Sequence, residues 1–218
     1  MHMPDISPIE KPKLLLVEGK DEVNFFAALL KHLGSSDIDV REVGGKDNFS
    51  KEFPTLLNDP GFNSVRSYAI IRDADDSLEN TLASVQGLLK KYHQPVPDSH
   101  GGYAEKNDLR AGIFIMPGNA DEGMLEDLCL QTVADHPVNT CVNAYIECLR
   151  KVLEQPESNT AREDGHFYFP RNLAKARAQA FLAGLEKICS SVGVAAQAGY
   201  WDFEHDSLED LKDFLKKL

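Results

Sequence analysis

The feature that most restricts the fold of this chain is an alternation of short apolar runs with segments of helical spacing. The first run, Lys13–Val17, is followed by a Glu-Gly-Lys break and then by apolar residues at helical spacing up to Leu33. Similar runs follow at Ile38–Val43, Ser67–Arg72 and Gly112–Met116. Runs of this length predict buried strands, and the segments between them predict amphipathic helices. The sequence therefore predicts an α/β fold with a Rossmann-like, mostly parallel sheet covered on both faces.

Acidic residues follow several of these runs. Glu18 comes directly after the first run, Asp73 and Asp75 come after the third, and Glu126 lies shortly after the fourth. The carboxyl ends of parallel strands meet at one edge of a sheet, where ligands bind in open α/β sheets. An extended backbone would point Asp73 and Asp75 to the same side. Because carboxylates that close repel one another unless a cation compensates them, the sequence predicts a divalent-cation site at this edge.

The pattern changes after about residue 135, where only helical spacing remains. This change divides the chain into an α/β core over residues 12–135 and a helical appendage, packed on the core, over residues 136–218. The polar stretch Gln155–Gly165 within the appendage is a candidate linker. Helices are expected at three places in the appendage: Val138–Leu153, Asn172–Cys189 and Ser207–Leu218.

The charge balance limits the kinds of partner. The chain has 35 acidic and 23 basic residues, for a formal net charge of −12. Proteins that coat nucleic acid gain affinity by neutralising phosphates with Lys and Arg, so this balance argues against such a protein. An acidic chain can still act on phosphates through a bound metal ion, because Asp and Glu hold divalent cations.

The apolar runs are far too short to cross a bilayer, and the first residues lack the basic and apolar regions of a signal peptide. The four cysteines form no Cys-x-x-Cys pair, and a chain of 218 residues does not need disulfides to hold its core. We therefore expect a cytoplasmic protein with free thiols and no membrane contact.

Two segments of the core resemble the motifs of Toprim domains. The segment Leu14–Glu22, an apolar strand that ends in Glu-Gly with another Glu four residues later, resembles the first motif. The segment Ala69–Asp75, an apolar strand that ends in Asp-Ala-Asp about 55 residues further on, resembles the second. The segment Gly123–Leu128 is similar to an acidic segment of the nuclease branch, where a Glu helps to hold metal. The chain thus resembles small stand-alone Toprim-like proteins and the Toprim domains of overcoming-lysogenization-defect nucleases and bacterial primases.

The resemblance implies a Toprim fold and a role for each acidic residue. Glu18 would be the general acid or base, while Asp73 and Asp75 would hold Mg²⁺, for which Mn²⁺ could substitute. Glu22 and Glu126 would support a second ion. The implied activity is Mg²⁺-dependent, nuclease-like phosphotransfer on the phosphodiesters of DNA or RNA. Because the net charge disfavours binding of a long polyanion, we expect a helper protein to supply basic surface.

Two other functions fit parts of the sequence. The segment Asp73–Ser77 also fits the strand-ending Asp-x-Asp-x-Ser motif of haloacid-dehalogenase-type phosphatases, in which Asp73 would be the nucleophile. That interpretation leaves Glu18-Gly19 unexplained. The other alternative is a non-catalytic Toprim-like module that binds a nucleotide, a nucleic acid or a protein. Lys20 and Lys46 are candidates for contacts to phosphate, and we interpret the basic residues of Arg171–Arg177 as a solvated helix face.

Overall fold

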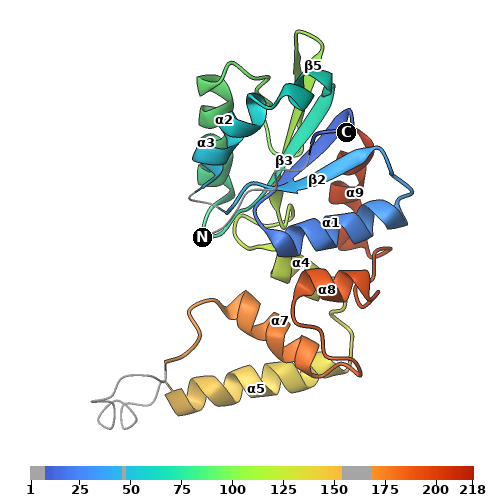
Figure 1. Ribbon diagram of the computed structural model, residues 1–218. Helices are drawn as coiled ribbons and strands as arrows, with labels where there is room; N and C mark the ends of the chain where they lie inside the picture. The colour runs from blue at the N-terminus through green and yellow to red at the C-terminus, as the bar shows by residue number, and fades with distance from the viewer. Residues whose placement is uncertain (1–7, 46–47, 154–167) are drawn as a thin grey trace.

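A five-stranded sheet lies at the centre of the computed structural model, which describes residues 8–45, 48–153 and 168–218 (Figure 1). Its strands are β1 (Lys13–Val17), β2 (Ile38–Glu42), β3 (Ser67–Asp73), β4 (Tyr103–Lys106) and β5 (Leu109–Met116). They lie in the order β2-β1-β3-β5-β4, and all pairs are parallel except the antiparallel pair of β4 with β5. The mostly parallel α/β sheet that the sequence predicts is therefore confirmed.

The inner strands are continuous apolar runs because helices cover both faces of the sheet. β3 is buried over its whole length, and so are the last four residues of β1 and the last six of β5. A strand buried on both faces cannot alternate between apolar and polar residues. The register places Leu16 of β1 beside Ile70 of β3, and Ile70 beside Ile113 of β5. The residues that follow β1, β3 and β5 consequently meet at one edge of the sheet.

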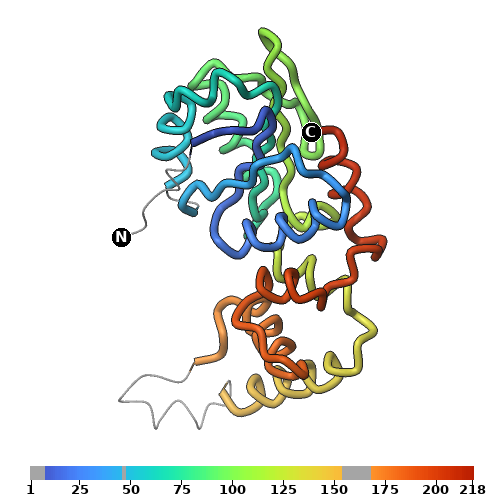
Figure 2. Tube along the Cα trace, turned by 45° about the vertical axis from the view of Figure 1, so that its right-hand side comes forward, coloured from blue at the N-terminus to red at the C-terminus, as the bar shows by residue number. Residues whose placement is uncertain are grey.

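Two layers of helices cover the sheet (Figure 2). The helices that form these layers are α1 (Lys20–His32), α2 (Phe49–Leu57), α3 (Leu78–Lys91), α8 (Val192–Gln197) and α9 (Glu209–Lys216). On one face, α2 and α3 pack around Tyr68, with Phe53 and Leu89 fully buried. On the other face, α1, α8 and α9 enclose a larger core that includes Phe25 and Phe114. The sheet is therefore the middle of three layers.

The C-terminal helices of the described chain are only partly those that the sequence predicts. The predicted helix Val138–Leu153 is present with the same bounds as α5. The predicted helix Asn172–Cys189 is shorter: α7 (Leu173–Ala183) begins after Asn172, whose side chain accepts a hydrogen bond from the Lys175 N–H, and ends before Gly184. A Cβ at Gly184 would lie 2.8 Å from Val138 of α5, so α7 ends at a close contact with α5 that a larger residue would not allow. The sequence did not predict α8.

The remaining segments are short, and they complete the path of the chain. They are α4 (Leu125–Gln131) and the 3₁₀ helices η1 (Pro60–Ser64) and η2 (Asp206–Leu208). Within the described residues, no helix has the length and apolar character needed to cross a membrane. The candidate linker Gln155–Gly165 and the candidate phosphate contact Lys46 lie outside the described residues.

The helices after residue 135, which the sequence predicts as one appendage, pack in two different places. In α9, Phe214 stacks on Tyr103 with ring centroids 4.7 Å apart, and the Tyr103 hydroxyl donates a 2.8 Å hydrogen bond to the Phe214 carbonyl. A Cβ at Gly112 would lie 2.5 Å from the Tyr103 ring, so only glycine permits this contact. α9 is thus part of the layer that covers the sheet, whereas α8 packs mainly on α1. The expected appendage, as a separate unit of residues 136–218, stays a prediction.

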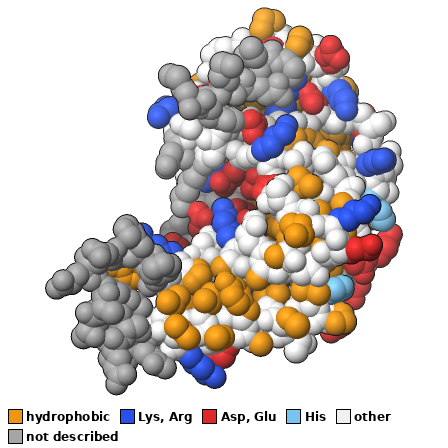
Figure 3. Space-filling view, turned by 60° about the horizontal axis from the view of Figure 1, so that its bottom comes forward, with side chains coloured by type: hydrophobic (Ala, Val, Ile, Leu, Met, Phe, Trp, Pro, Cys, Tyr) orange, Lys and Arg blue, Asp and Glu red, His pale blue; other side chains and the backbone are white. Residues whose placement is uncertain are grey.

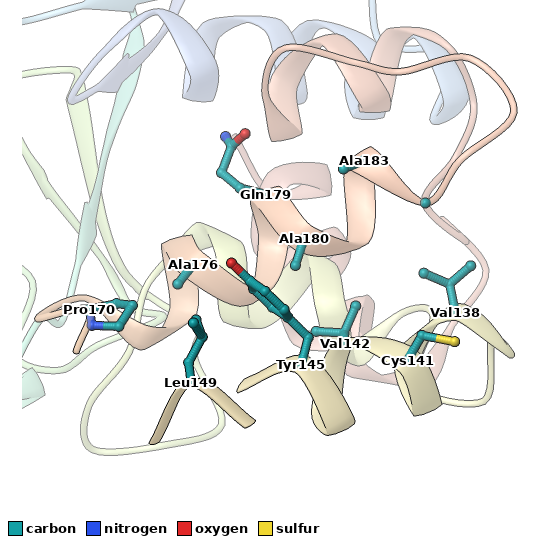
Figure 4. Close-up of a pocket in the computed structure, with 11 residues that line it drawn as sticks. Val138, Cys141, Val142, Tyr145, Leu149, Pro170, Ala176, Gln179, Ala180 and Ala183 are labelled. Atoms are coloured by element: carbon teal, nitrogen blue, oxygen red, sulfur yellow. The ribbon is translucent and has the colours of Figure 1, made fainter. Parts of the chain in front are cut away.

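By contrast, α5 and α7 pack on each other below the sheet in the view of Figure 1, and α7 also packs on α4. α5 buries only Val142 and Ile146 among its 16 residues. Between the two helices lies an apolar groove of about 710 Å³. Figure 4 shows Tyr145 of α5 reaching toward Ala176 and Ala180 of α7 across this groove. The pair therefore has a much smaller core than the sheet.

Candidate carboxylate site

The site lies where β1 and β3 end and α4 begins. Glu18 follows the last residue of β1, Asp73 is the last residue of β3, and Leu125 is the first residue of α4. Because β1 and β3 pair directly and in parallel, these ends are adjacent. Residues 55 positions apart in sequence are thereby in contact, since the Asp73 N–H approaches Glu18 Oε1 at 3.4 Å.

An ion pair between Glu18 and Arg72 holds one side of the site. Arg72 Nε donates a short hydrogen bond to Glu18 Oε1. The side chains of Arg72 and Glu18 are only 6% and 16% exposed. The Arg72 guanidinium also lies 5.4 Å from the centroid of the Phe49 ring, within range of a cation–π interaction. Arg72 is not among the site residues expected from the sequence. A charged residue near the end of an apolar strand could have indicated that it takes part in the site.

Asp73 is the most buried carboxylate of the site, at 8% exposure. Its Oδ1 accepts a 3.0 Å hydrogen bond from the Leu125 N–H at the start of α4. Burial nevertheless raises the pKa of Asp73 well above its usual value, and the negative charges of Glu18, Glu22 and Glu126 raise it further. Burial and neighbouring negative charges therefore both favour the protonated form of Asp73.

Glu22 and Glu126 complete this group of carboxylates. Burial raises the pKa of Glu22, and the charges of Glu18 and Glu126 add to that effect. Burial also raises the pKa of Glu126, although Lys175 of α7 partly offsets it from 4.0 Å away. Although Glu126 lies in the first turn of α4, its side chain is only 14% exposed. We refer to Glu18, Glu22, Asp73 and Glu126 as the carboxylate cluster.

Asp75 is placed differently from what the sequence suggests. The backbone of Asp75 has φ 51°, in the left-handed region, so the Asp-Ala-Asp segment is not extended there. Its N–H and carbonyl exchange hydrogen bonds of 3.0 and 2.9 Å with Gly123. Asp75 lines a polar groove of about 730 Å³ together with Glu122 and Arg171. The argument that an extended backbone points Asp73 and Asp75 to one side is therefore wrong.

The cluster fits a hard divalent cation by the chemistry of its donors but is not a complete ligand set. Within the described residues, no three Asp, Glu, His or Cys side chains are arranged so that they could share one metal ion. All donors of the cluster are carboxylate oxygens, which Mg²⁺ prefers, and Mg²⁺ commonly takes one or two carboxylates and keeps several waters. Figure 3 shows acidic side chains gathered near the middle of one face, with Lys or Arg side chains beside them. Binding of Mg²⁺ stays a prediction.

One acid close to the cluster has a structural role that the sequence did not reveal. The Asp21 carboxylate accepts a short hydrogen bond from the Ser191 hydroxyl and a 3.3 Å hydrogen bond from the Gly193 N–H at the start of α8. A Cβ at Gly193 would lie 2.3 Å from the Asp21 carbonyl oxygen, so α1 and α8 approach as closely as glycine allows. Asp21 thus fixes α8 to α1 beside Glu22.

The comparisons with known proteins give a family and two distant structural likenesses. The family described as "Protein of unknown function (DUF3226)" matches residues 12–218. Among curated proteins there is no match. The chain is similar to the C-terminal region of the OLD protein of Xanthomonas campestris pv. campestris, with 18% identity, 95% of each chain covered and a TM-score of 0.46. It is also similar to the C-terminal region of the Burkholderia pseudomallei OLD protein, with 15% identity, 95% of this chain and 98% of that chain covered, and a TM-score of 0.45.

Proposed function

The chain belongs to the family of proteins of unknown function described as DUF3226, and we propose that it is a Mg²⁺-dependent, nuclease-like phosphodiesterase. The observation that carries this proposal is the carboxylate cluster. Glu22, Asp73 and Glu126 are drawn together at the carboxyl edge of the sheet, where each has a raised pKa. Buried carboxylates with perturbed pKa values gather at functional sites more often than elsewhere. A divalent cation is the simplest partner for them.

Asp73 would hold the ion, with Glu22 or Glu126 as a second carboxylate ligand, and water would complete the coordination shell. When bound, the ion would polarise a phosphate oxygen and stabilise the charge that develops on it. Asp73 is fixed for this task because the α4 N–H at Leu125 holds its Oδ1, which leaves Oδ2 for the ion. Asp75 stays a predicted ligand whose contribution needs a separate test.

Glu18 would act as the general acid or base. Arg72 Nε and the Asp73 N–H both contact Oε1 of Glu18, so Oε2 is the oxygen that would exchange a proton with water or with the leaving group. Two donors to one oxygen fix the plane of the carboxylate. A proton-transfer group held in this way contributes roughly 10²–10⁴-fold to a rate.

The proposed substrate is a phosphodiester of DNA or RNA. With a net charge of −12, the chain should bind a long polyanion weakly by itself. Basic side chains at the site are already engaged or lie to one side of it: Arg72 pairs with Glu18, Lys175 pairs with Glu126, and Arg171 lines the polar groove. We therefore propose that a partner protein supplies most of the contacts that position the strand.

A phosphatase that uses Asp73 as a nucleophile fits less well. Asp73 is 8% exposed, and one of its oxygens already accepts a hydrogen bond from α4. A nucleophilic carboxylate needs direct access to the phosphorus atom of the substrate. The buried position of Asp73 favours a ligand role instead.

A Mn²⁺ titration by calorimetry tests the proposed metal site. We expect Asp73→Asn and Glu22→Gln to weaken binding by at least about tenfold, or about 1.4 kcal/mol. Asp98→Asn and Glu79→Gln are matched controls, because these side chains are exposed and lie outside the cluster. Unchanged Mn²⁺ binding in both cluster variants would remove the basis of the proposal. Asp75→Asn in the same series decides whether Asp75 is a ligand.

Cleavage of an end-labelled single strand tests the proposed activity. We expect slow cleavage that requires Mg²⁺ or Mn²⁺, stops in EDTA and is lost in Glu18→Gln. A Glu18→Gln protein that still binds Mn²⁺ but does not cleave would separate proton transfer from metal binding. Metal binding without any cleavage, with or without partner proteins, would favour a non-catalytic binding module.

A further inference from the structure

Arg72 has donors that the carboxylate cluster does not use. Its Nε is engaged by Glu18, and its face lies against the Phe49 ring. Within the described residues, no group accepts a hydrogen bond from either Nη atom of Arg72. The residue is nevertheless 95% buried, because its exposure is only 5%. The Nη atoms are not among the buried unpaired side-chain atoms of the described residues, so they reach solvent and are available to an acceptor that enters from outside.

These donors reach a pocket on the α2–α3 face of the sheet. Arg72 is one of the residues that line this pocket of about 430 Å³. The first turn of α2 contributes Phe49 and Ser50, and α3 contributes residues from Ser84 to Lys91. Arg72 is the buried floor, whereas Ser50, Ser84 and Lys91 are exposed at the rim. The pocket therefore joins a buried cation to solvent.

The charge of this pocket differs from that of the molecule as a whole. Two of its lining residues, Arg72 and Lys91, are basic, and none of its described lining residues is acidic. The chain as a whole carries an excess of 12 negative charges. A guanidinium fork matches the geometry of an oxyanion and can bind two of its oxygens at once. Hydroxyl groups such as those of Ser50 and Ser84 can bind further oxygens.

We propose that this pocket is a phosphate-binding site, in which the Nη atoms of Arg72 bind two phosphate oxygens and Lys91 and the serine hydroxyls bind the rest. The ligand is a phosphate group, either free or on a nucleotide, or an internal phosphate of a nucleic-acid strand. The proposal goes beyond the phosphodiesterase function and does not depend on it, because no residue of the carboxylate cluster lines the pocket.

A pair of variants at Gly87 tests the site without touching Arg72. Gly87 lines the pocket from the middle of α3, and no atom lies within 4 Å of the position that its Cβ would take. Replacing a glycine inside a helix also tends to stabilise the helix. Both Gly87→Glu and Gly87→Gln should therefore fold. They have the same shape and differ only in the charge that they bring to the pocket.

Calorimetric titrations in EDTA measure the binding. The probes are inorganic phosphate, a 5′-mononucleotide and a single-stranded oligonucleotide that lacks terminal phosphates. We expect phosphate binding in the millimolar range or better, weakened about three- to tenfold more by Gly87→Glu than by Gly87→Gln, as for one added charge at a partly exposed site. Binding of only the first two probes would identify a free or terminal phosphate as the ligand. If Gly87→Glu weakens binding of the oligonucleotide as much as it weakens binding of inorganic phosphate, the ligand is an internal phosphate.

Variants of the lining cations complete the test. Lys91→Gln should weaken binding by about three- to fivefold, as for a solvent-exposed ion pair, whereas Lys90→Gln on the same helix should not. Because the titrations are made in EDTA, they do not load the metal site, so a failure of the metal site would not be mistaken for a failure of this one. Absence of binding by all three probes at millimolar concentration, or equal affinities in the two Gly87 variants, would overturn the proposal.

Discussion

The carboxylate cluster and the α5–α7 pair differ in which side chains they bury and which they expose. The cluster places acidic groups in a buried environment, where Asp73 is 8% exposed and burial and neighbouring acids raise its pKa. The α5–α7 pair does the reverse, since it leaves large apolar side chains such as Tyr145 at 53% exposure. Buried charges reduce stability, and an exposed apolar face contributes little to it. The stability of both regions therefore depends on the core around the sheet, and substitutions in each region can measure that dependence.

Phe181→Ala should have the largest effect. Phe181 of α7 is 1% exposed and stacks on Trp201, with ring centroids 5.5 Å apart, so it fixes the α5–α7 pair to the segment that leads to α9. We expect a loss of about 3–5 kcal/mol in the free energy of unfolding, the usual cost of removing a buried Phe side chain. Urea denaturation followed by fluorescence and by circular dichroism measures it. Separate transitions by the two probes would show that the pair unfolds independently of the sheet.

Arg72→Met should have the next largest effect. Removing Arg72 leaves Glu18 largely buried without its cation, which typically costs about 3–5 kcal/mol. The double variant Glu18→Gln/Arg72→Met should recover part of this loss, because it also removes the uncompensated charge. Denaturation of the two single variants and the double variant gives the coupling energy. Strictly additive effects would mean that the ion pair does not stabilise the site.

Asp73→Asn should increase stability in the absence of metal. Asparagine can still accept the hydrogen bond from the Leu125 N–H, while the negative charge near Glu18 and Glu22 disappears. We expect a gain on the order of 1 kcal/mol, the lower end of the cost of a poorly compensated buried polar group. Thermal unfolding in EDTA measures the gain. A loss of stability would indicate that an existing cation already compensates Asp73.

The buried carboxyl groups should also make the stability of the protein depend on pH. The pKa of Asp73 is raised by burial and then by neighbouring acids, and burial also raises the pKa values of Glu22 and Glu126. A carboxyl whose pKa is higher in the folded state keeps its proton longer when folded, so stability falls as pH rises from the unfolded-state pKa to the folded-state pKa. We expect the free energy of unfolding in EDTA to fall from about pH 4 upward. Asp73→Asn should reduce this slope, and an unchanged slope would exclude Asp73 as its source.

Tyr145→Ala should have the smallest effect. The side chain is 53% exposed at the groove between α5 and α7, and it closes no core. Surface substitutions of this kind usually change stability by less than about 0.5 kcal/mol. Urea denaturation of Tyr145→Ala and Phe181→Ala measures both losses and compares a buried with an exposed side chain of the same helix pair. A loss of several kcal/mol would mean that the groove is part of the folding core.

The sequence predicted most elements that depend on local preferences. The expected strand Lys13–Val17 and helix Val138–Leu153 have the same bounds in the structure. Ser77, a residue type that favours helix starts, caps α3 and accepts a hydrogen bond from the Asn80 N–H. Apolar runs, helical spacing and caps act over a few residues, so they can be identified from the sequence. The mostly parallel sheet followed from their alternation.

Contacts between distant segments decided the rest. The pairing of Arg72 with Glu18 and the fixing of α8 to α1 by Asp21 join residues 54 and 170 positions apart. The left-handed backbone of Asp75 results from its bridge to Gly123, which no local pattern reveals. The sequence by itself indicated which acids reach the carboxyl edge of the sheet, because the parallel direction of the strands follows from their alternation with helices. Only the tertiary structure decided which of them share a buried environment, since burial and charge coupling depend on how separate segments pack.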